Sequence, residues 1–296
     1  MSWTELWSSL FSFQDYGALL ALVHNSLIAA AVLGLVGGFV STFVMTRDLA
    51  FAVHGISELS FAGAAFALLV GANVVFGAIG GSLIAALIIG LAGVRARERN
   101  SITGVLMPFG LGLGILFLAL YPGRSANAFS LLTGQIVAVD DPHLLVLVVI
   151  CAIVAAGMLV LWRPLLFTSV DPVVAAARGV PARLVSVVFL LLLGLIVAVA
   201  VQIIGALLVL ALLVIPAAAA MRVTASPPLV ALLSTVFGVL AMVGGVLLAV
   251  GGSLPISPYV TTISFLVYLV CRVVGRLRRG AGRRDVPALA PAGKAG

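Results

Sequence analysis

A histidine and a glutamate lie four residues apart in a stretch that is otherwise apolar, FAVHGISELSFAG at 51–63. Glu58 is the only acidic residue well inside any apolar segment, and His54 is the only histidine comparably placed. Residues four apart share one face of a helix, so the two side chains can converge on one point. A charged group at mid-membrane costs roughly 2.5–3.5 kcal/mol even on insertion scales, so such a pair requires a reason.

Three roles are open for this pair: handling of a metal cation, relay of a proton, or a hydrogen bond that only holds helices together. An imidazole nitrogen and a carboxylate oxygen suit zinc, manganese or ferrous iron, whereas calcium and magnesium prefer shells made only of oxygen. Two ligands are too few for a closed site. In a two-fold dimer with this helix at the axis, second copies of His54 and Glu58 would bring the set to four.

The other histidines are weaker candidates. His24 lies near the outer end of the first apolar segment, where a structural role is favoured. Asp140, Asp141 and His143 follow one another closely in an outer loop. They could load a cation or dock a binding protein, but a solvated helix start is the favoured interpretation.

The composition places these residues in a membrane protein. Hydrophobic residues make up 63% of the 296 and charged residues 8%, whereas roughly a quarter of the residues in soluble domains are charged. Apolar stretches of 18 or more residues are long enough to cross a bilayer as helices, and alternating barrel strands are absent. We therefore predict an all-α, polytopic bundle with eight or nine transmembrane helices, at about 18–45, 49–71, 74–94, 101–121, 143–162, 183–202, 203–221, 228–250 and 257–273.

The formal charge of +7 indicates orientation in the membrane rather than binding of nucleic acid, because the arginines lie in short loops and the C-terminal tail. Three parts are expected. Residues 1–17 form an interfacial segment with aromatic anchors, residues 18–275 the transmembrane domain, and residues 276–296 a basic, disordered cytoplasmic tail.

The chain cannot hydrolyse ATP by itself, because its one lysine, Lys294, has no phosphate-binding loop around it. The loop sequence VDPVVAAARGV predicts a short helix on the cytoplasmic face. Asp171 is a good N-cap, Arg178 complements the C-terminal dipole, and Gly179 ends the helix. Such a helix is either an ordinary connector or a coupling helix that docks on an ATPase subunit.

Five segments in order resemble the permease subunits of bacterial ABC transporters for zinc, manganese and iron, over about residues 25–270. They are RDLAFAVHGISELSFAGAAFALLVG, NSITGVLMPFGLGLGILFLALYPGRSANAFSLLTGQIVAV, DPVVAAARGV, GALLVLALLVIPAAAAMRV and GGSLPISPYVTTISFLVYLV. The third matches the family's acid-x-x-x-A-x-x-x-G cytoplasmic motif, with Asp171, Ala175 and Gly179 at its fixed positions.

The resemblance implies a multi-pass protein of the bacterial inner membrane, surrounded by lipid and not an enzyme. Its implied partners are a second copy of itself, a cytoplasmic ATP-binding subunit and an extracytoplasmic metal-binding protein. A divalent metal, zinc first and manganese or iron next, would pass His54 and Glu58 by alternating access and would not be held as a cofactor. Asp171, Ala175, Arg178 and Gly179 would couple the permease to the ATPase.

Two departures from the family pattern stand out. The family has the acid first and the histidine four residues later, whereas this chain has His54 first and Glu58 second. Ser253 stands where the family often has aspartate, which removes a carboxylate near the outer mouth. The rival function is a gradient-driven cation transporter or channel that works without an ATPase.

Overall fold

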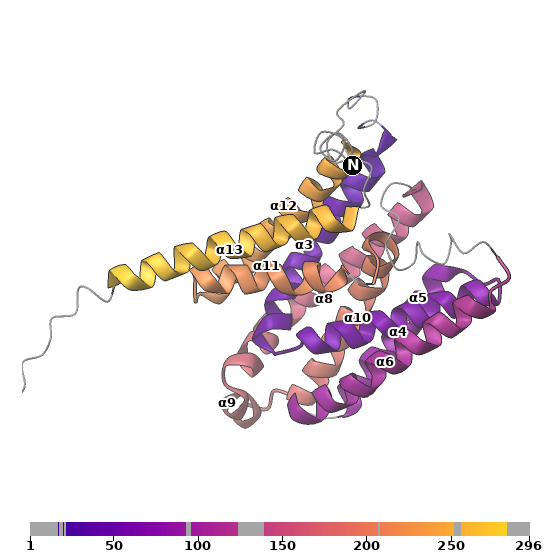
Figure 1. Cartoon of the computed structure of the whole chain (residues 1–296). Coiled ribbons are helices and arrows are strands. Elements are labelled where there is room, and N and C mark those ends of the chain that lie inside the picture. Colours follow the sequence, from indigo (N-terminus) through magenta and orange to yellow (C-terminus); the bar gives the residue numbers. More distant parts are fainter. Residues whose placement is uncertain are drawn as a thin grey trace, which may run out of the picture.

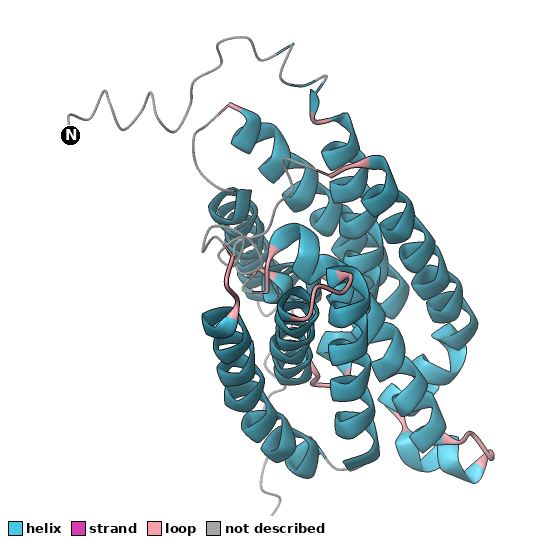
Figure 2. Cartoon of the chain, turned by 90° about the vertical axis from the view of Figure 1, so that its right-hand side faces the viewer, coloured by secondary structure: helices cyan, strands magenta, loops and turns pink. Residues whose placement is uncertain are grey.

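Every regular element in the described part of the chain is an α-helix, as Figure 2 shows. The computed structural model describes residues 17, 20, 22–92, 96–123, 139–206, 208–251 and 256–282. The predicted all-α class is confirmed.

The helices form two groups joined by a central pair (Figure 1). Helix α4 packs between α5 and α6, while α3, α11, α12 and α13 pack against one another on the other side. Helices α8 and α10 pack together and link the groups, because α8 contacts α3 and α10 contacts α4 and α5. The bounds are α3 His24–Thr46, α4 Ala50–Leu69, α5 Val74–Ala92, α6 Ala96–Leu120, α8 Asp141–Val170, α9 Pro172–Ala177, α10 Ala182–Ile204, α11 Val209–Val223, α12 Pro227–Val250 and α13 Ile256–Gly282.

Eight helices in the described residues are long and apolar enough to cross a membrane, which is the lower of the two predicted numbers. The segment predicted at 203–221 forms α11, which has only 15 residues. At 1.5 Å per residue such a helix is about 22 Å long, short of the ~30 Å hydrocarbon core. The break before it is Gly205, which follows α10 with φ +83°, a conformation that glycine adopts without strain.

Close contacts between backbones hold α4 in place. A Cβ atom at Gly81 of α5 would lie 2.1 Å from the Leu59 carbonyl oxygen, and one at Gly110 of α6 would lie 3.1 Å from the carbonyl carbon of Glu58. The first approach is possible only for glycine and the second is tight for any larger residue, as expected where small residues bring helices together. Both contacts lie beside Glu58.

The structure describes only part of the N-terminal and C-terminal segments predicted from the sequence. Residues 1–16 lie outside the described residues, as do Ser253 and residues 283–296. The interfacial role of 1–17 therefore stays a prediction. Helix α13 continues to Gly282, so residues 276–282 of the predicted tail are helical.

Candidate functional site

Helix α4 carries both residues of the buried pair. The chain turns tightly after α3, where Asp48 has φ +53°, and α4 begins two residues later at Ala50. His54 and Glu58 lie in its second and third turns on one face, with His54 Nε2 3.8 Å from Glu58 Oε1. This distance is too long for a hydrogen bond, so the two side chains do not tie each other down.

The two side chains are largely buried, but each has a polar atom without a hydrogen-bond partner among the described residues. Glu58 is 3% exposed, and the His54 side chain is 23% exposed. Within the described residues, His54 Nδ1 and Glu58 Oε2 are buried and have no hydrogen-bond partner. Leaving a buried polar atom unpaired costs about 1–3 kcal/mol, and such atoms are rare in folded proteins. The arrangement therefore leaves an imidazole nitrogen and a carboxylate oxygen that could coordinate a cation.

One chain does not complete a metal site from these groups. The described residues contain no cluster of three or more histidine, cysteine, aspartate or glutamate side chains that could hold an ion. The neighbouring Ser57 directs its hydroxyl to the backbone instead, 3.0 Å from the His54 carbonyl oxygen. Among the described residues, no further acidic, histidine or cysteine side chain therefore completes a shell around this pair.

The second candidate cluster, Asp140, Asp141 and His143, begins α8. The Asp140 side chain accepts hydrogen bonds from the His143 backbone N–H and from the His143 ring. The Asp141 carboxylate accepts one from Asn25 Nδ2 at 2.7 Å. The hydrogen bond from His143 lowers the pKa of Asp140. These contacts are those of a capped, solvated helix start, the interpretation favoured from the sequence.

Helix α9 has the ends predicted for it. The Asp171 carboxylate accepts a hydrogen bond from Val174 N at 2.9 Å, and Gly179 follows the helix with φ +76°. Ala175 is fully buried, so it holds α9 against the rest of the chain. The opposite face is open to solvent, with Val173 77% and Val174 41% exposed. The role of α9 as a coupling helix stays a prediction.

The structure gives Arg47 a place that the sequence did not indicate. It is one of the loop arginines, and its guanidinium is partly buried between α8 and α10. Burial, followed by the nearby charge of Arg99, lowers the pKa of Arg47 to about 10, so it remains charged at neutral pH.

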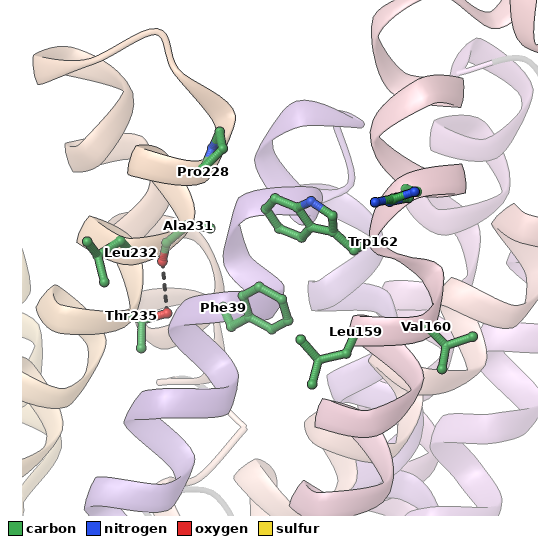
Figure 3. Close-up of a pocket in the computed structure, with 9 residues that line it drawn as sticks. Phe39, Leu159, Val160, Trp162, Pro228, Ala231, Leu232 and Thr235 are labelled. Carbon is green, nitrogen blue, oxygen red and sulfur yellow. Dashed lines mark hydrogen bonds between the residues drawn. The ribbon is translucent and has the colours of Figure 1, made fainter.

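A separate groove of about 550 Å³ opens between α3, α8 and α12 (Figure 3). Phe39 and Trp162 stack across it at 5.6 Å between ring centroids, and the Thr235 hydroxyl is bonded to the Ala231 carbonyl. Its one charged lining residue, Arg163, is a cation. Its lining residues include no anionic or imidazole ligand.

Comparison with known proteins identifies the family. The ABC 3 transport family matches residues 20–275. The chain belongs to this family. The manganese transport system membrane protein MntC of Halalkalibacterium halodurans is 30% identical over 237 residues, which are 80% of this chain and 81% of that protein. The manganese import system permease protein ScaB of Streptococcus gordonii is 28% identical over 263 residues, 88% and 94% of the two chains.

A solved structure agrees in fold. One chain of PsaBC from Streptococcus pneumoniae, in complex with a Fab, superposes with a TM-score of 0.81 at 26% identity, covering 92% of this chain and 99% of that one. The predicted resemblance to metal-uptake ABC permeases is confirmed. The prediction of a multi-pass membrane transport protein rather than an enzyme is confirmed as well.

Proposed function

We propose that this chain forms the membrane path of an ATP-driven importer for a divalent transition metal, and that the ion passes between His54 and Glu58. The observation that carries the proposal is the pair of buried, unpartnered atoms, His54 Nδ1 and Glu58 Oε2. A passing cation would use this unmet bonding capacity for part of each cycle. Weak, transient coordination by few ligands permits release on the far side.

The missing ligands come from a second copy of the chain. One His54 and one Glu58 give two ligands, and two-fold symmetry doubles each to make four. Four nitrogen and oxygen donors are enough for a tetrahedral site. The homodimer is therefore part of the proposed site and not only of the architecture.

Manganese is the first cargo to test, and zinc the second. The relatives MntC and ScaB are named for manganese transport or import. The donor set favours zinc instead, because imidazole suits zinc and zinc generally binds more strongly than manganese or ferrous iron. In this account the reversed order of histidine and acid changes the depth of each donor but not the donor set.

A separate ATPase supplies the work in this proposal, and α9 receives it. The exposed Val173 and Val174 offer an apolar contact, while Asp171, Ala175 and Gly179 hold the helix in shape. Arg178 extends its charged end toward solvent. Closure of an ATPase dimer would move α9 and open the shared path to one side at a time. An extracytoplasmic metal-binding protein would deliver the ion from outside.

Reconstitution tests the proposal against its rival. Proteoliposomes containing the permease with its ATPase are expected to take up Mn²⁺ or Zn²⁺ only when ATP is present, and permease alone should take up none. Uptake by permease alone down an ion gradient would support a gradient-driven transporter or channel. Equal uptake by wild type, His54→Ala and Glu58→Ala would remove the pair from the path.

A further inference from the structure

Arg47 joins three helices at the end of α3 that leads into α4. Its Nη1 donates to Thr168 Oγ1 at 2.9 Å and to Ser169 Oγ at 3.4 Å, both in the last turn of α8. Its Nη2 donates to Ser186 Oγ in the second turn of α10. Helix α9 lies between α8 and α10 in the chain, so Arg47 contacts the helices on both sides of it.

The acceptors around Arg47 are oriented and neutral. The Thr168 hydroxyl donates to the Pro164 carbonyl at 2.8 Å and the Ser169 hydroxyl to the Leu165 carbonyl at 2.6 Å. Their lone pairs are then free to face the guanidinium. No ion pair between Arg47 and an acid is present in the described part of the chain. Bonds from a cation to neutral hydroxyls are weaker than ion pairs in a buried setting, so they can be exchanged during a conformational change.

Arg99 of α6 also binds the turn between α3 and α4, through the backbone. Its Nη2 donates to the carbonyl oxygens of Arg47 at 3.1 Å and of Asp48 at 3.5 Å. Leu49 N bonds back to Val44 O at 2.8 Å, which closes the turn around the left-handed Asp48. These bonds make a stiff link between Arg47 and the first turn of α4.

Aromatic packing below Arg47 joins the same three helices. Phe43 of α3 packs edge-on against Trp162 of α8, 5.1 Å between ring centroids, and lies 6.2 Å from Phe189 of α10. Packing as well as hydrogen bonds therefore connects α3 to both α8 and α10. His54 and Glu58 lie four and eight residues after the start of α4 at Ala50, which is about 6 and 12 Å along that helix at 1.5 Å per residue.

We infer that Arg47 is a positioning residue that couples the α8–α9–α10 unit to the His54–Glu58 helix, through Thr168, Ser169 and Ser186 on one side and the Asp48 turn on the other. This inference rests on the proposed function, because it assigns the route by which movement of α9 reaches the metal path. A residue that only stabilised the fold would affect hydrolysis and transport together. A coupling residue changes the amount of metal moved per ATP.

The test uses proteoliposomes that contain the permease–ATPase complex, with Mn²⁺ supplied outside. It measures the number of metal ions delivered per ATP hydrolysed and compares this ratio between variants. Arg47→Gln removes the charge, Arg47→Lys keeps the charge without the fork, and Arg276→Gln on exposed α13 is the matched control. We expect Arg47→Gln to lower metal per ATP about tenfold, in line with losing hydrogen bonds to a charged group, with hydrolysis within about twofold of wild type. Arg47→Lys should lie between, and Arg276→Gln should match wild type.

An unchanged ratio of metal to ATP in Arg47→Gln would overturn the inference, and so would a parallel loss of both activities. If Arg47→Gln does not assemble, the double variant Thr168→Val, Ser186→Ala removes the main acceptors and is judged by the same ratio. In the Arg47→Gln background, Ser186→Ala should lower the ratio no further, since the bond is already lost. Failure of the proposed function is distinct, because the wild-type complex would then deliver no metal with ATP.

Discussion

An acidic side chain lies close to a histidine in the second and third turns of α4, and again at the start of α8. At α8, Asp140 and Asp141 are exposed and bonded to His143 and Asn25. In α4, Glu58 is 3% exposed and its Oε2 has no partner within the described residues. The carboxylates at the start of α8 thus have hydrogen-bond partners, whereas the carboxylate in α4 has an oxygen without one.

The difference separates structure from function. A helix cap uses its polar atoms fully, and its energy is recovered in the fold. A buried carboxylate with one oxygen unpaired is a cost to the fold. The pair in α4 is therefore the place where a ligand is expected.

The largest expected effect comes from removing the carboxylate charge. Glu58→Gln keeps the size of the side chain but binds a cation poorly. ATP-driven uptake of Mn²⁺ should fall about 100-fold, because even loss of an outer-shell partner costs 10–100-fold in metal affinity. Uptake assays with Asp140→Asn as the matched acid-to-amide control would measure this, and equal losses in both variants would erase the contrast between the two sites.

An exchange of the pair tests whether donor type or donor depth matters. The double variant His54→Glu, Glu58→His restores acid-first order while keeping one nitrogen and one oxygen ligand. It should retain uptake within about tenfold of wild type, while either single exchange should lose more, as expected for residues acting as a unit. A double variant no better than the worse single one would show that position, rather than the donor set, governs transport.

Acidification should affect the α4 pair more than the α8 cluster. Metal binding needs neutral imidazole and ionised carboxylate, so protons compete with the ion. As the pH is lowered and protons displace the ion, uptake should fall by up to about tenfold per pH unit. Initial rates between pH 5.5 and 8 at constant ATP hydrolysis would show it. A rate that rises on acidification would instead support proton relay.

The smallest effect is expected at the α8 cap. Asp140→Ala removes a cap and should lower the melting temperature by about 2–3 °C without changing uptake. Because the His143 hydrogen bond lowers the pKa of Asp140, the stabilisation it provides is present above the ordinary aspartate range. It is lost as the pH falls through the lowered value. A fall in uptake in this variant would place the cluster in metal loading.

The sequence could predict features that depend on local order. The capped ends of α9, from Asp171 to Gly179, follow from residue types a few positions apart, and so does the common face of His54 and Glu58. The contacts of Arg47 could not be predicted, because Thr168 and Ser186 lie far away in the chain. Nor could the missing partners of Glu58, which depend on how α5 and α6 pack around α4.

The most direct test of the central claim is pulsed electron paramagnetic resonance on Mn²⁺ bound to the purified permease–ATPase complex. Nitrogen coupling from an imidazole ligand is expected in the wild type and should be lost in His54→Gln. The Mn²⁺ signal should be weaker in Glu58→Gln. Bound Mn²⁺ with only water and oxygen ligands in the wild type, or nitrogen coupling that persists in His54→Gln, would contradict it.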